Sequence, residues 1–207
     1  MLMSERHNYI YVHVYKVAGQ SVKLALRRYH YRHLPGLRTP LSHVLESPQA
    51  YTFRSVEAHS TAAQLRDWLG QEKWDSLYSF SFVRNPWDWQ VSLYHFIQKN
   101  KFNYQRRLVS SMTFDDYIRW RVEEDLHLQS EFIFDRHGKQ LVDFVGRYEQ
   151  LDTDFATIAE RIGVKASLPH VNASSHASWR SYYNDTTASL IADAFAPDIE
   201  AFGYSFE

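Results

Sequence analysis

Residues 9–26 read YIYVHVYKVAGQSVKLAL, and this stretch contains the succession of elements that decides the fold. The first seven residues, Tyr9 to Tyr15, are all β-branched or aromatic apart from His13, which is typical of a buried strand. A short turn with one glycine covers residues 16–20, and Ser21 then opens a stretch with helical apolar spacing. A strand that leads through a tight turn into a helix N-terminus is a common anion-binding arrangement.

The alternation of strands and helices continues along the chain. Strands are predicted over 51–58 and 77–83. Helices are predicted over 61–69, capped by Ser60 and ended by Gly70, over 87–99 after Pro86, and from Thr113 onward. Further on, residues 132–134 and 141–148 are predicted to pair as a hairpin, Asp152 to cap a helix that reaches Ile162, and two short helices to cover 186–195 and 197–202. The pattern predicts an α/β fold with a central, mostly parallel sheet flanked by helices, in a single domain over residues 1–207.

The net charge of −1 conceals an uneven distribution of charge along the chain. Met1 to Met112 carries 15 Lys and Arg against 7 Asp and Glu, a net of +8, whereas Thr113 to Glu207 carries 8 against 17, a net of −9. The first half therefore has an excess of cationic side chains that could bind an anionic ligand. The sign alone does not distinguish phosphate or sulfate groups, acidic sugars and nucleic acid.

Composition excludes several other classes. The chain has no cysteine, which rules out disulfides and cysteine-based metal sites, and its pattern offers no metal-ligand cluster. No apolar run is long enough for a transmembrane helix, and residues 1–15 lack the layout of a signal peptide. We therefore expect a soluble, cytoplasmic protein without a membrane segment or a bound metal.

Two segments carry residues suited to binding phosphate-like groups. In Lys16-Val17-Ala18-Gly19-Gln20-Ser21, backbone N–H groups can surround anionic oxygens while Lys16 adds a point charge. The lysine precedes the glycine, so this is not a Walker A loop, and a plain strand-to-helix turn remains an equal alternative for this segment alone. In the second segment, Arg84 follows a strand and can grip a phosphate with two N–H groups, while Ser92 offers a hydroxyl two turns along the next helix.

Together these segments resemble the two donor-binding elements of sulfotransferases that use 3′-phosphoadenosine 5′-phosphosulfate (PAPS), in the carbohydrate or family 2 branch. In that family a P-K-x-x-G-T-S loop and a later R-N-P-x-x-R-x-x-S-x-Y segment follow two strands. The second segment here, residues 84–94, reads RNPWDWQVSLY and departs only at Trp89. The first has Tyr15 in place of the proline and Gln20 in place of the threonine. Looser likeness extends through residues 146–149, 168–174 and 198–204, and so spans nearly the whole chain.

The resemblance implies a P-loop-NTPase-like α/β fold and in-line transfer of a sulfuryl group from PAPS to a hydroxyl, with PAP as the second product and no metal. It places the 5′-phosphosulfate against Lys16, Val17, Ala18, Gly19, Gln20, Ser21 and Val22, and the 3′-phosphate against Arg84 and Ser92. Lys16 would stabilise the charge that develops on the leaving phosphate. The family branch implies a glycan or glycolipid acceptor. Arg180 lies where relatives place a loop over the nucleotide.

An acceptor hydroxyl needs a general base, and His59 resembles the histidine that carries this role in several relatives. Free imidazole has a pKa of about 6.5, which suits the task, and Glu57 is the alternative base.

Two other function classes stay open. A P-loop kinase would bind ATP with Mg²⁺, although the order Gly-Lys-Ser/Thr is missing. A non-catalytic module would use the basic half to hold acidic glycan or, less plausibly, nucleic acid. The acid-free stretch 89–114, with Lys99, Lys101, Arg106 and Arg107, is either an acceptor groove or a solvated basic loop.

Overall fold

The computed structural model of the chain describes residues 2–29, 59–169 and 178–207. These residues form two compact units. The first contains Met1–Phe82 and Glu131–Val171, and the second contains Val83–Ser130 and Asn172–Glu207. The predicted strand over 51–58, which includes the alternative base Glu57, lies outside the described residues.

The first unit is built on a sheet whose order in the described part of the chain is β1-β2-β3-β4. The strands are β1 (Leu2–Ser4), β2 (Tyr9–Tyr11), β3 (Tyr78–Val83) and β4 (Phe144–Arg147). β2 and β3 are parallel, with Tyr9 opposite Tyr78, whereas β1 is antiparallel to β2. The expected α/β fold with a mostly parallel sheet is therefore confirmed. The short antiparallel strand β1 was not predicted, because three residues are too few to show a period.

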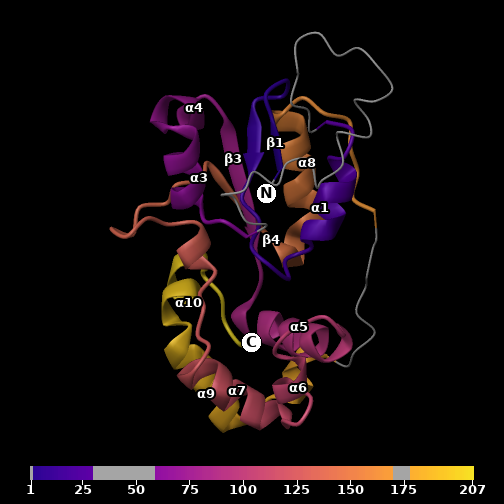
Figure 1. Cartoon of the computed structure of the whole chain (residues 1–207), viewed down its shortest axis with the longest axis vertical. Helices are drawn as coiled ribbons and strands as arrows, with labels where there is room; N and C mark the ends of the chain where they lie inside the picture. The colour runs from indigo at the N-terminus through magenta and orange to yellow at the C-terminus, as the bar shows by residue number, and fades with distance from the viewer. Residues whose placement is uncertain (1, 30–58, 170–177) are drawn as a thin grey trace. The chain divides into compact units, whose positions relative to one another are not determined.

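Four α-helices accompany this sheet among the described residues: α1 (Gly19–Ala25), α3 (Ala62–Leu69), α4 (Gln71–Asp75) and α8 (Leu151–Arg161). α3 and α4 lie on one side of the strands, and α1 and α8 lie on the other (Figure 1). The sheet is thus covered on both faces, which explains why β2 and β3 are almost continuously apolar.

The core of the first unit is aromatic. Tyr11 stacks on Phe80 with ring centroids 5.2 Å apart, and Phe82 packs edge-on against Phe80 at 6.5 Å. Asp143 joins β3 to the start of β4, because its carboxylate accepts bonds of 2.7 Å from both the backbone N–H and the hydroxyl of Ser79. At Gly146 on β4 the ring of Phe82 comes so close that a Cβ there would lie 2.5 Å from the ring atom Cε1. The glycine is required by this close approach.

The second unit is helical. It contains α5 (Pro86–Lys99), α6 (Arg106–Val109), α7 (Phe114–Glu123), α9 (Asp185–Ala194) and α10 (Ala196–Phe202), together with the 3-10 turn η4 (Trp179–Tyr182). Figure 1 shows α7 and α9 side by side, and these two helices make extensive contact. The predicted helix over 87–99 and the predicted cap Thr113, whose hydroxyl accepts from the N–H of Asp116, are confirmed.

Several predicted boundaries were wrong, each for a local reason. Thr61, not Ser60, caps α3, because Thr61 and Gln64 form a reciprocal capping box. α8 begins at Leu151, directly after the 3-10 turn η3 (Tyr148–Gln150), so Asp152 lies in the first turn and does not cap the helix. The predicted strand 9–15 is regular only to Tyr11. The predicted hairpin is reduced to one bridge, Phe134 to Gln140, preceded by a 3-10 turn η2 (Ser130–Phe132).

We predict that Gly146→Ala lowers the free energy of unfolding by about 1–3 kcal/mol, because the added methyl must displace the buried ring of Phe82. Urea denaturation of the purified variant measures this. Adding Phe82→Leu to Gly146→Ala gives the new methyl room, so the double variant should lose less than the sum of the two single losses. Strict additivity would contradict the proposed contact.

Candidate functional site

The turn after β2 has the strained backbone of a ligand-binding loop. Lys16 and Ala18 both adopt left-handed conformations, with φ of 64° and 62°, although neither is glycine. Each such residue costs about 1 kcal/mol or more, and strain of this kind gathers at ligand-binding sites. Left-handed residues in a tight turn are also how backbone N–H groups come to form concave anion-binding surfaces. The anion loop stays a prediction, and the two left-handed residues show that this turn is tightly wound.

Side chains of this loop divide into buried and accessible groups. Val17 and Val22 are fully buried, so only their backbone can face a ligand, and Gln20 is exposed. The helix after the loop, α1, begins at Gly19 and not at Ser21 as predicted, because Val22 already donates its backbone N–H to Ala18. Gln20 and Ser21 are therefore first-turn residues of the helix.

Gly19 has a packing role that the sequence did not reveal. A Cβ built on it would fall inside the imidazole ring of His13, which comes from the strand side of the loop. His13 is 9% exposed, and its ring stacks on that of His59 with centroids 4.5 Å apart and 36° between the planes. The glycine, the buried histidine and the exposed histidine thus form one packed column within the first unit.

The contact of His59 with the backbone determines which of its nitrogens carries the proton. Its Nδ1 lies 3.1 Å from the carbonyl oxygen of His13. Since a carbonyl oxygen only accepts, Nδ1 must be the donor, and in neutral imidazole the lone pair then resides on Nε2. Tyr15 packs edge-on against the same ring at 5.9 Å. His59 is therefore oriented from two sides, in the tautomer that a general base working through Nε2 requires.

Arg84, from the second motif, lies in the second unit and is engaged in a buried ion pair. Its Nε and Nη2 donate to the two carboxylate oxygens of Asp88, at 2.7 and 2.8 Å. The side chains of both residues are nearly buried, with exposed fractions of 6% and 10%. The sequence predicted that Arg84 grips a phosphate with two N–H groups. In the structure the edge formed by Nε and Nη2 of the guanidinium is bonded to Asp88, which lies in the first turn of α5.

A second set of contacts fixes the backbone around Arg84. The side-chain amide of Gln129 accepts from the N–H of Arg84 at 2.9 Å and donates to its carbonyl at 2.7 Å. Gln129 and Ser130 in turn donate their backbone N–H groups to the buried carboxylate of Asp198. Asn85 caps α5 through bonds from the N–H groups of Trp87 and Asp88. Sequence reasoning missed Gln129 and Asp198, because both lie far from the motif along the chain.

Other candidate residues of the second unit have plainer surroundings. Trp89 is fully buried against Phe195, and the indole of Trp87 donates to the carbonyl of Ala188, so both tryptophans serve packing. Ser92 lies on α5 and is partly exposed. Arg180, in η4, places its guanidinium 4.1 Å from the ring centroid of Trp179 and donates from Nε to the carbonyl of Phe206.

Residues 2–29, 59–169 and 178–207 contain neither a candidate metal-ligand cluster nor a candidate membrane span. No three His, Cys, Asp or Glu residues in these ranges are grouped to hold a metal ion. Each helix in the same ranges is too short or too polar to cross a bilayer.

Comparison with known proteins gives two findings. The model of the Sulfotransferase family matches residues 1–205 and therefore includes both units. An uncharacterized protein of the archaeon Archaeoglobus fulgidus is 28% identical over 109 residues, which cover 52% of this chain and 85% of that protein.

We predict that Gly19→Ala lowers the free energy of unfolding by about 1–3 kcal/mol, because its methyl collides with the ring of His13. Combining it with His13→Ala should recover part of that loss, as measured by urea denaturation. Ala18→Gly is the control in the same loop. It relieves a left-handed residue and should leave stability unchanged or raise it by up to about 1 kcal/mol. Equal losses from Gly19→Ala with and without His13 would contradict the packed column.

Proposed function

The chain belongs to the sulfotransferase family and is a sulfate-transferring enzyme, and from this premise we propose that PAPS is its donor and a carbohydrate or glycolipid hydroxyl its acceptor. We further propose that both compact units serve one transferase domain over residues 1–207, since the family match spans both.

The observation that carries the proposal is the joint presence of an anion loop and an oriented base in the first unit. His13 contacts both parts: its ring occupies the space at Gly19, and its carbonyl holds Nδ1 of His59. Sulfuryl transfer needs the donor sulfate and the attacking oxygen brought together, and such positioning supplies most of the catalysis in transfers of this type. A loop and a base fixed to the same histidine support that function.

In the proposed reaction the acceptor oxygen attacks the sulfur of PAPS in line with the bond that breaks. The acceptor proton passes to Nε2 of His59, the new bond joins sulfur to the acceptor oxygen, and the bond between sulfur and the bridging phosphate oxygen opens. The electron pair of that bond stays on the 5′-phosphate of PAP. Lys16 and the N–H groups of residues 17–21 meet this charge, which is electrostatic stabilisation at the leaving group, whereas the N–H of Val22 is already bonded to Ala18. The products are a sulfate ester and PAP.

For the 3′-phosphate we propose Arg84 and Ser92, with Arg180 as a further contact to the nucleotide. Asp88 gives this assignment a specific form. Because Nε and Nη2 bond to Asp88, a phosphate meets the outer face of a guanidinium whose orientation is already fixed. A fixed guanidinium loses little side-chain entropy when the nucleotide binds.

The donor is tested by thermal-shift titration with PAP and with ADP. We predict that PAP stabilises the protein, by about 2.7 kcal/mol at 100 times its dissociation constant, and that ADP does so much less.

Ser92→Ala should weaken PAP binding and leave the melting temperature of the free protein unchanged. It is preferable to Arg84→Ala, which would strand the buried carboxylate of Asp88 and lower stability by itself. Lys101→Ala, which removes an exposed cation elsewhere in the second unit, is the control. Equal shifts with PAP and ADP would refute the donor assignment.

The base is tested by His59→Asn, whose amide nitrogen lies where Nδ1 was and keeps the bond to the carbonyl of His13. We predict that this variant binds PAP normally and loses turnover by about 10²–10⁴-fold, the usual contribution of general acid–base catalysis. In the wild-type protein the rate should rise with pH as the imidazole loses its proton, since only the neutral form accepts the acceptor's proton. His59→Asn should abolish that rise. Undiminished turnover in the variant would remove His59 from the mechanism.

A further inference from the structure

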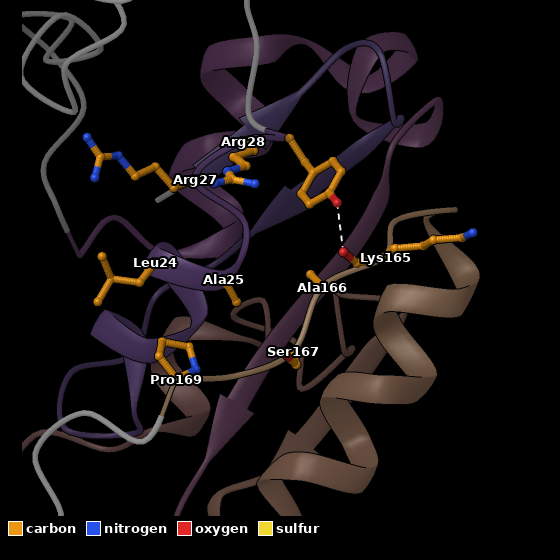
Figure 2. A pocket seen from close by; sticks show the side chains of 9 residues that line it. Leu24, Ala25, Arg27, Arg28, Lys165, Ala166, Ser167 and Pro169 are labelled. Atoms are coloured by element: carbon orange, nitrogen blue, oxygen red, sulfur yellow. Dashed lines mark hydrogen bonds between the residues drawn. The ribbon is translucent and has the colours of Figure 1, made fainter.

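The first unit contains a hollow outside the loop and the histidine pair. It lies between the end of α1 and the segment that follows α8, with residues 24–29 on one side and 165–169 on the other (Figure 2). Its volume is about 410 Å³, within the usual range for ligand pockets.

The described residues that line this hollow carry only positive charge. Arg27, Arg28 and Lys165 are all exposed, and none of the other described lining residues is acidic. Within the described part of the chain none of the three side chains forms an ion pair. Other cations of the same unit do have carboxylate partners, such as Lys73 with Glu5 at 3.4 Å. The three cations therefore form an unneutralised group at one concave place, which favours an anionic ligand.

Hydrogen bonds hold the two sides of the hollow together. The hydroxyl of Tyr29 donates to the carbonyl oxygen of Lys165 at 2.7 Å (Figure 2). His7 packs edge-on against the ring of Tyr29 at 5.5 Å, and its Nδ1 lies 3.3 Å from the carbonyl oxygen of Ile162. The end of α1 is thereby fixed to the segment after α8. A site held in this way needs little rearrangement to bind its ligand.

The directions of the side chains indicate the shape of that ligand. In Figure 2, Arg27 and Lys165 extend outward on opposite sides of the hollow. The positive charges therefore flank the opening, which suits a long ligand with several anionic groups better than one small anion. Leu24 is 47% exposed, and with Ala25 and Pro169 it adds an apolar surface. Among the described residues of the lining Tyr29 alone is aromatic, and these residues therefore offer little of the stacking surface that single-stranded nucleic acids use.

We propose that this hollow is a binding site for a polyanionic saccharide, held by Arg27, Arg28 and Lys165 through its sulfate or carboxylate groups. The inference deepens the proposed function, on which it rests for the saccharide's role as acceptor. The seven residues of α1, at 1.5 Å each, separate the anion loop at the start of the helix from the hollow at its end by about 10 Å. A chain bound in the hollow would be held away from the reacting hydroxyl and would serve acceptor affinity, not the chemical step.

The test is fluorescence anisotropy with a labelled heparin dodecasaccharide and a labelled single-stranded oligonucleotide of similar charge, at several salt concentrations. We predict that Arg27→Ala/Arg28→Ala/Lys165→Ala weakens saccharide binding at least tenfold and reduces its dependence on salt.

The matched control, Lys99→Ala/Lys101→Ala/Arg107→Ala, removes three exposed cations from the second unit and should change binding less than twofold. Arg106 is spared because it donates to the carbonyl of Gln98. Equal losses in the two triple variants, or no loss in the first, would overturn the site, and so would an oligonucleotide that binds as tightly as the saccharide.

Two further measurements separate this inference from the proposed donor. The first triple variant should keep the wild-type melting temperature and the full thermal shift with PAP, since its three side chains are exposed and lie apart from the loop. If the melting temperature falls, Arg28→Ala/Lys165→Ala gives the same comparison with fewer changes. Absence of any PAP effect in the wild-type protein would refute the donor but leave the saccharide result standing. A normal PAP effect in the wild-type protein, together with unchanged saccharide binding in the first triple variant, would refute the saccharide site alone.

Discussion

In the first unit the ring of His13 packs directly against the backbone of Gly19, and the turn after β2 and the position of the His59 ring both depend on this contact. The ring occupies the volume that any side chain at position 19 would need. It also stacks on His59, while the carbonyl of His13 fixes the proton of that imidazole on Nδ1. One residue shortly after β2 thus contacts both the loop and the imidazole of His59. A lone glycine in a strand-to-helix turn usually signals a left-handed backbone, but here it signals a close approach, since Gly19 does not have a positive φ.

The second unit uses a different constraint, a desolvated charge. Burying Arg84 would be costly without a partner, and Asp88 provides one in bidentate geometry. Such a pair adds little net stability compared with apolar packing, because desolvation offsets most of the attraction. Its consequence is orientation: the guanidinium is fixed by Asp88, and its backbone is fixed by Gln129. This fixed geometry explains why the motif places an acidic residue one turn after the arginine in this chain.

Much of the fold and part of the site could be predicted from local signals. β3 and the helix after Pro86 were evident from an apolar run and from the Asn-Pro start, and the loop at Lys16 from its position between a strand and a helix. β1 and the exact caps of α3 and α8 were not, because they depend on two or three residues whose alternatives differ by one hydrogen bond. The roles of His13, Gln129 and Asp198 were missed because they arise from contacts across 45 to 69 positions of sequence. Contacts between residues so far apart leave no periodic pattern of residue types along the sequence.

The uneven charge of the sequence acquires a more specific meaning from the structure. A surplus of cations over residues 1–112 could be spread over a surface, where each charge is solvated and attracts ligands only weakly. Within the first unit, Arg66 and Lys73 have carboxylates within 3.7 Å, whereas the cations around the hollow have none among the described residues. Two of these cations, Arg27 and Arg28, line a concave surface together with Lys165 from later in the chain, and the low-dielectric walls of such a surface focus the field more than a flat surface does. Ligand attraction is expected where cations without carboxylate partners line a concave surface, as Arg27, Arg28 and Lys165 do near the end of α1.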